Sequence, residues 1–406
     1  MAHKPPIRSF KGSPLPVIQI GILGLLTIFS YGSWFYGFGV LLDDMTTDFD
    51  SGVGVLTLGY TIAQILTGVL GMVAGRLLDQ FGSRVPFAIG TLLGPTIVFL
   101  ASIQSNPSVF SILFGIGSGV IGATSFYHLT QTVAARLSVG NESRAIALLT
   151  IWGAFASPIL IPVTELMRQS FGWRNTVRSS AVVVALVLVA AALFVDRDLA
   201  TKSRAPSVSS RLAVAEAWNL PQVRRYAVSS FVSSFGTSII MVLQIPVMVA
   251  GGIERSTAAS LAGARGFAQL LGRLPLGYVL SRLPTRNILI GAKILVAVGA
   301  LLLSMSSNLF VAILFVVVAG IGIGAVSPLD GIYAREVLPA QDLGTLMGSM
   351  HFFGGFTSGF GPLIGAVIID VTGRDSSALV FAALMLLIGA VWLLPSKPER
   401  VSQATL

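Results

Sequence analysis

The chain has no cysteine and few charged residues. The absence of cysteine from its 406 residues excludes disulfides, thiolate catalysis and cysteine-ligated metals. Three histidines, His3, His128 and His351, lie far apart, and their spacings are not those of a zinc site. We therefore expect neither a metal nor a cofactor. Charged residues make up 11% of the chain, against roughly 25% in an average soluble protein.

Apolar residues dominate what remains. Hydrophobic residues make up 54% of the chain, and its mean hydropathy is +0.84. Because a soluble fold cannot bury this much apolar surface, we expect a lipid bilayer to surround most of the protein. This excludes a cytosolic enzyme and a nucleic-acid-binding domain, and the net charge of +9 does not require a nucleic-acid partner.

Apolar runs of about twenty residues, the length that crosses the hydrocarbon core, recur along the chain. They predict an all-α integral membrane protein with twelve transmembrane helices in two pseudo-symmetric six-helix bundles. The predicted segments are an N-tail (1–15), a first bundle (16–195), a linker (196–223), a second bundle (224–395) and a C-tail (396–406). The predicted spans are 16–42, 54–78, 84–104, 107–135, 143–167, 175–195, 224–250, 257–281, 286–305, 308–333, 343–369 and 376–395.

The basic residues predict the orientation. Most of the 26 lysines and arginines fall on the side of the membrane that also carries both tails. By the positive-inside rule this side is the cytoplasm. We expect a multi-pass protein of the inner or plasma membrane with both termini cytoplasmic, its basic loops facing an anionic leaflet.

A weak internal repeat links the two halves. The sequence GRLLDQFGSR at 75–84 matches GYVLSRLPTR at 277–286, each at the end of the second span of its half. Two halves of like topology are typical of transporters that hold a substrate between them near the midplane. In the first copy, Gly75 and Gly82 favour close helix approach and a tight turn. Asp79 and Arg84 are then placed to pair as a latch of one conformational state, or to remain loose charges on a solvated turn.

Span 8 carries charge where the bilayer is apolar. Arg265, Gln269 and Arg273 follow the spacing i, i+4, i+8, which puts them on one drifting helix face. Intramembrane charges are costly and mark functional sites. The permanently charged, planar fork of arginine matches a carboxylate, so an anionic substrate is expected. Alternatively, Arg273 caps carbonyls or pairs with Asp330, and Arg265 serves as an entry charge.

Other spans contribute further candidates. His351 in span 11 supplies a second cation or carries a coupling proton, unless it is a hydrogen-bonded structural residue. We read His128 as structural, Lys293 as reaching the membrane surface, and both Asp43 and Asp44 as solvated. Four uncharged polar or aromatic residues are expected to complete the pocket, unless they only pack helices: Tyr36, Tyr127, Trp152 and Gln244.

These motifs resemble a known family. Gly75, Asp79, Gly82 and Arg84 follow the loop signature between spans 2 and 3 of the major facilitator superfamily, with Gln80 where a basic residue is usual. The resemblance covers nearly the whole chain. Three strings, YGFGVLLDDM (36–45), FGWR (171–174) and GFGPLIGAVIIDVTG (359–373), are similar to the monocarboxylate and oxalate/formate porter branch.

The resemblance implies site roles. In that branch a span-8 arginine binds the substrate carboxylate, and Arg273 matches it here. The oxalate/formate porter has a lysine at about the place of His351. The animal carriers couple protons through a lysine and an aspartate, whose positions hold Tyr36 and Gln269 here. Since these two cannot form that ion pair, symport by that mechanism is not implied, and exchange or facilitated flux stays open.

Together these features predict a secondary transporter of small organic anions, monocarboxylates foremost, with a coupling proton or counter-anion. Three alternative functions have sequence requirements of their own. Efflux of hydrophobic or cationic compounds requires a mid-depth acid, and Asp330 is predicted too near a span end. A membrane-embedded enzyme needs a clustered acid/base or metal set, and a transport-dead sensor or scaffold needs an extra soluble domain. ATP-driven transport has no support, because the chain holds no Gly-Lys-Ser/Thr string.

Overall fold

The computed structural model of the chain describes residues 16–138, 141–195, 210–339 and 343–394. Every regular element in these ranges is helical. Ten of the described helices or helical runs are long and apolar enough to cross a membrane. The predicted all-α membrane fold is confirmed.

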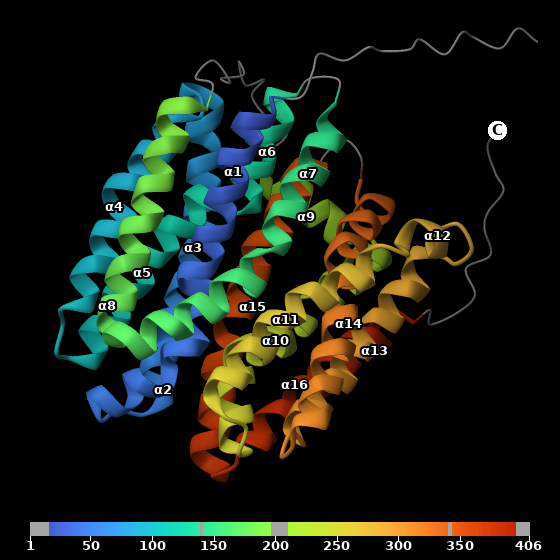
Figure 1. Cartoon of the computed structure of the whole chain (residues 1–406). Helices are drawn as coiled ribbons and strands as arrows, with labels where there is room; N and C mark the ends of the chain where they lie inside the picture. Colours follow the sequence, from blue (N-terminus) through green and yellow to red (C-terminus); the bar gives the residue numbers. More distant parts are fainter. Residues whose placement is uncertain (1–15, 139–140, 196–209, 340–342, 395–406) are drawn as a thin grey trace, which may run out of the picture.

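The first half, left in Figure 1, contains six spans built from nine helical elements. They are α1 (Val17–Ser30), a π-helical turn η1 (Tyr31–Tyr36), α2 (Gly37–Phe49), α3 (Val53–Phe81), α4 (Arg84–Ser102), α5 (Pro107–Ser125), α6 (Tyr127–Leu137), α7 (Glu142–Ala154) and α8 (Ala156–Phe194). Predicted span 143–167 is formed by α7 and the start of α8, and the rest of α8 contains most of predicted span 175–195. The long α8 turns at Gly172, whose φ of +75° favours glycine.

The second half, right in Figure 1, repeats this plan. Its helices are α9 (Ser210–Trp218), α10 (Pro221–Ala250), α11 (Arg255–Arg273), α12 (Leu276–Leu280), α13 (Thr285–Ser304), α14 (Leu309–Val337), α15 (Leu343–Thr372) and α16 (Asp375–Trp392). The short α9 lies inside the predicted linker. Predicted span 8 corresponds to α11 with α12, and its charged residues lower its hydropathy below that of an ordinary span.

Glycines set the closest helix contacts within each half. Gly115 of α5 packs on Ile62 of α3, where an added Cβ would lie 2.6 Å from the Ile62 Cβ. Gly320 of α14 packs against α11, where an added Cβ would lie 3.0 Å from the Arg265 carbonyl oxygen. These glycines begin two runs of the form GxxxG, Gly115 to Gly119 and Gly320 to Gly324, which pack helices as small-residue motifs do in membranes.

The two halves meet near one end of the molecule, at the bottom of Figure 1. We call this the closed end; it carries the turn at Asp50 and the start of α11 at Arg255. Close contacts there join α2 to α10 at Gly39 and α8 to α11 at Gly263. Along α3 and α15, Thr61 donates to the Gly359 carbonyl at 2.6 Å. Toward the opposite end, where α1 begins, the bundles diverge.

Candidate functional site

The helix α11 crosses the middle of the molecule and carries the predicted charges. It starts at the closed end, where the Glu254 carboxylate caps the backbone N–H groups of Ser256 and Thr257 at 2.9 and 2.8 Å. Hydrogen bonds from the Ser256 hydroxyl and these N–H groups lower the pKa of Glu254 to about 2. The cap therefore stays ionised at ordinary pH and holds the start of the helix that presents Arg265 and Arg273.

Arg265 is fully buried without a carboxylate partner among the described residues. Its exposed fraction is 0%. Its Nε donates to Gln244 Oε1 at 3.0 Å, and one Nη lies 3.2 Å from the Met241 sulfur. The other Nη has no hydrogen-bond partner there. A buried guanidinium left this incomplete is costly, so an added hydrogen-bond acceptor at this nitrogen would stabilise it.

Arg273 lies two turns further along the same helix, about 12 Å from Arg265 at 1.5 Å per residue. It is half-buried, and its Nε donates to the Gly324 carbonyl at 3.3 Å. This bond matches the carbonyl-capping alternative drawn from the sequence. It leaves the two terminal nitrogens of the fork without a partner among the described residues, so capping and anion binding are compatible.

Two glutamines accompany the arginines. Gln244 is buried and orients Arg265, since its oxygen accepts from the guanidinium while its amide donates to the Met241 carbonyl at 3.1 Å. Gln269 is buried between the two arginines along α11 and packs against Gly324 of α14. The structure thus brings all four predicted residues of spans 7 and 8 into one region.

The facing wall comes from the first half and is aromatic. The π-helical turn Tyr31–Tyr36 crowds aromatic side chains, and such turns recur at functional sites. Phe126 stacks on Tyr31 with 3.7 Å between ring centroids. Tyr36 lies within electrostatic range of both arginines, and Tyr127 within range of Arg273. Two predicted pocket residues of the first half therefore lie near the charged helix of the second half.

Trp152 lies on the same side but serves packing. Its ring covers Gly24 of α1, where an added Cβ would lie 2.5 Å from the Trp152 ring. It shares a small apolar cluster with Tyr31 and Tyr36. Its packing role matches the alternative drawn from the sequence, although the cluster places it next to the aromatic wall.

The remaining predicted residues are only partly described. His351 belongs to α15 and Asp79 to α3, but their side chains lie outside the described residues. Gly82 ends α3 with φ +77°, as the predicted tight turn requires. Gly75 has no described atom within 4 Å of an added Cβ, so no close helix approach occurs there among the described residues in this conformation. Arg84 is exposed at the start of α4.

A polar cavity lies between the halves beside Met241. Its volume is about 210 Å³, and its lining includes Phe35, Gln64, Lys293 and Asp330. The expectation that Lys293 reaches the surface is wrong, because the residue is 0% exposed and donates to Ser229 and Ser233 at 2.8 and 3.1 Å. Serine hydroxyls inside the bundle satisfy the ammonium in place of water.

Two corrections concern acids. Asp330, predicted too near a span end, lines this cavity. Asp43 and Asp44, predicted to be solvated, pair with Arg255 of the other half at 3.4 Å each. The reason in both cases is tertiary, since each acid meets helices that lie far away in the sequence.

The structural reading of His128 is supported by its Nε2, which lies 3.0 Å from the Ala123 carbonyl where α5 ends.

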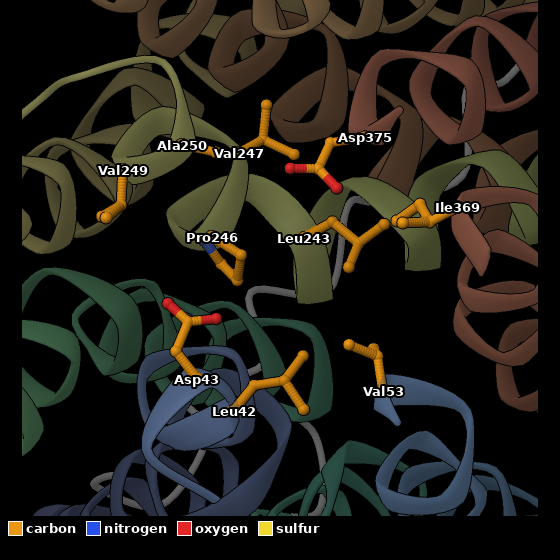
Figure 2. A pocket seen from close by; sticks show the side chains of 10 residues that line it. All are labelled: Leu42, Asp43, Val53, Leu243, Pro246, Val247, Val249, Ala250, Ile369 and Asp375. Atoms are coloured by element: carbon orange, nitrogen blue, oxygen red, sulfur yellow. The ribbon is translucent and has the colours of Figure 1, made fainter. Parts of the chain in front are cut away.

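Arg255 is the centre of an ion cluster that joins the halves at the closed end. Its Nη2 also donates to the Val40 carbonyl at 2.7 Å, and its Nε lies 3.7 Å from Glu165. Arg168 pairs with Asp44 and Glu165 at 2.8 Å each. A second cavity of about 260 Å³ adjoins the cluster, with Asp43 from one half and Asp375 from the other on its walls (Figure 2).

Comparisons with known proteins agree with this architecture. A family model described as Major Facilitator Superfamily matches residues 23–228 and again 226–405. The nitrite extrusion protein of Bacillus subtilis is 24% identical over 95% of this chain and 98% of its own length. An MFS transporter of Aspergillus flavus, asaE, is 26% identical over 81% of this chain and 74% of its own length. Monocarboxylate transporter 12 of Homo sapiens is 20% identical over 82% and 71%.

Solved structures share the fold. A mutant of the nucleoside transporter NupG superposes with a TM-score of 0.77 at 15% identity, covering 93% of this chain and 96% of that one. A bacterial homologue of the lysosomal transporter Spinster, described as inward-facing and occupied, gives a TM-score of 0.73 at 14% identity, covering 94% and 96%. The relatives are transporters rather than enzymes. The chain belongs to the Major Facilitator Superfamily and is a multi-pass membrane transporter.

Proposed function

We propose that the protein transports small organic anions, monocarboxylates foremost, by alternating access of the two halves to a site at the arginines of α11. The observation that carries this proposal is that Arg265 is fully buried with one terminal nitrogen unsatisfied and with no carboxylate partner among the described residues. The site is electrostatically incomplete until an anion enters it.

The two arginines have different roles in this proposal. Arg273 is half-buried and keeps its terminal fork for the ligand, so it holds the carboxylate in a bidentate pair. Arg265 is locked by Gln244 and strengthens the positive field of the site. His351 is proposed to add to that field when protonated.

The orientation follows from the basic loops. With both termini in the cytoplasm, the closed end faces outward and the molecule is open toward the cytoplasm. The pair of Asp79 and Arg84 is proposed to latch the opposite state, in which the cytoplasmic ends approach each other. Rocking between these states exposes the site to each side in turn.

The names of the relatives indicate which alternative substrates have to be tested. Three of these relatives are named for anions, as a nitrite extrusion protein, a probable nitrate transporter and a monocarboxylate transporter. Another is an efflux protein for agnestins. Efflux of a cationic compound needs an acid at the cavity; Asp330 is there, but the buried ammonium of Lys293 lies within its electrostatic range and offsets it. The test must therefore include inorganic anions and lipophilic cations.

The experiment is a thermal-shift screen of the purified full-length protein with carboxylates, nitrate, nitrite and lipophilic cations at two pH values. A ligand at about 100 times its Kd should raise the apparent Tm by about 3 °C, because only the folded state binds it. We expect one class of carboxylate to stabilise the wild type and to leave Arg273→Ala unchanged. Stabilisation by cations alone would support the efflux alternative. Stabilisation by nitrate or nitrite alone would indicate that the substrate is an inorganic anion.

A further inference from the structure

A stripe of hydroxyl side chains runs along one face of α10 toward the diverging end of the bundles. Ser230, Ser233, Ser234, Thr237 and Ser238 line the polar cavity beside Met241. Their spacing of three and four residues places them on one side of the helix. From Ser230 to Met241 the stripe is about 16 Å long at 1.5 Å per residue.

The described contacts leave hydrogen-bonding capacity on this stripe. Ser234 and Thr237 donate their hydroxyl protons to backbone carbonyls of their own helix, at 2.8 and 3.0 Å, so their oxygens still accept. The Ser233 oxygen accepts from Lys293, which leaves its own proton for another acceptor. The stripe therefore offers both donors and acceptors to a ligand.

The charges around this cavity oppose each other. The ammonium of Lys293 and the carboxylate of Asp330 both line it, and each lies in the field of the other. Because one cation and one anion nearly cancel, neither a second carboxylate nor an amine is favoured over neutral polar groups. Hydroxyl groups fit this environment, since they donate and accept without adding charge.

Met241 connects the stripe to the anion site. Its side chain lines the cavity, while its sulfur contacts the Arg265 guanidinium at 3.2 Å. Met241 therefore lies where the two regions adjoin, so a ligand that spans both would have its carboxylate at the arginines and its other end along the hydroxyl face of α10. The cavity of about 210 Å³ is smaller than the roughly 300–1,000 Å³ of pockets that hold drug-sized ligands, which suits a small metabolite.

We propose that the substrate is a hydroxylated carboxylate, with its hydroxyl groups bound along Ser233, Ser234 and Thr237 of α10. This inference rests on the proposed function, because it assigns the carboxylate to the arginines of α11. It adds a second binding region that selects polyhydroxy acids over aliphatic acids of the same length.

The test compares gluconate with hexanoate, two six-carbon monocarboxylates that differ in their hydroxyl groups, by calorimetric titration of the full-length protein. The wild type should bind gluconate at least about tenfold more tightly. The double variant Ser234→Ala with Thr237→Val should lose about tenfold in gluconate affinity and keep its hexanoate affinity, since two modest hydrogen bonds are removed. Thr91→Val is the matched control, because Thr91 makes the same bond to its own helix on α4, which does not line the cavity.

The outcomes separate the two proposals. Equal binding of gluconate and hexanoate, or equal weakening of both in the double variant, overturns the hydroxyl region and leaves the anion site intact. Failure of both acids to bind the wild type overturns the proposed function and this inference with it. Because the substituted hydroxyls bond only within α10 among the described contacts, the double variant should keep the wild-type Tm, and the Tm is measured alongside.

Discussion

Arg273→Lys is expected to lower the initial rate of carboxylate counterflow in proteoliposomes about 30-fold, although the positive charge is kept. Lysine offers a compact ammonium in place of a planar fork, so the bidentate pair with the carboxylate is lost. One charge-assisted hydrogen bond is worth about 2 kcal/mol, which corresponds to about 30-fold. Counterflow of labelled substrate, measured at substrate concentrations below half-saturation, reports this loss.

The matched control is Arg282→Lys. Arg282 is exposed after α12, with its guanidinium 4.5 Å from the centroid of the Tyr278 ring, so it is outside the site. This variant should transport at the wild-type rate. Wild-type counterflow in a well-expressed Arg273→Lys protein would remove Arg273 from the carboxylate site and leave it only its bond to the Gly324 carbonyl.

Arg255→Gln is expected to shift the conformational equilibrium away from the present state about tenfold. Arg255 joins α11 to Asp43, Asp44 and the Val40 carbonyl of the other half, and its side chain is only 19% exposed. Partly buried ion pairs of this kind contribute about 1–2 kcal/mol. This free energy favours the present state over the other, because the partners separate when the closed end opens.

Thiol labelling measures this shift cleanly, because the native chain has no cysteine. A cysteine replacing Leu243, buried at the closed end, should be labelled faster after Arg255→Gln. A cysteine replacing Ser230, on the cavity wall nearer the other end, should be labelled more slowly. Opposite changes distinguish a conformational shift from unfolding, which would accelerate both.

Asp48→Asn provides the control for the ion cluster. Asp48 pairs with Arg174 at 2.9 Å at the same end, but both residues belong to the first half. Breaking this pair should leave both labelling rates unchanged. Equal rates in wild type and Arg255→Gln would show that the cluster does not hold the closed end.

The span plan could be predicted from the sequence because apolar run length is a local property. Gly82 and Gly172 lie where the chain turns, and both have positive φ. The sequence also singled out Arg265, Gln269 and Arg273, since three polar residues at helical spacing within an apolar span are visible without tertiary information. Gln244 was grouped with them as a pocket residue, and it does contact Arg265.

Pairings between distant helices were not predictable in the same way. Lys293 resembles a snorkelling residue in sequence, and only the approach of α10 brings Ser229 and Ser233 to it. Arg255 is some 210 positions from Asp43, so no spacing rule connects them. The hydroxyl side chains at 230–238 recur every three or four residues in the sequence, but nothing in this local pattern indicates the buried ammonium of Lys293 beside them.

The contacts at Gly39 and Gly359 bear on which substitutions the protein tolerates. An added methyl group at either position would lie 2.6 or 2.9 Å from a backbone carbonyl of the other half, at Val242 and Thr61. We therefore expect any larger residue to keep the two halves apart here and to disfavour the present conformation without contacting the substrate. Gly277 and Gly291 have open space around them in the described structure and carry no such constraint. Glycines that look alike in the sequence thus divide into those that allow the two halves to approach closely and those with open space around them.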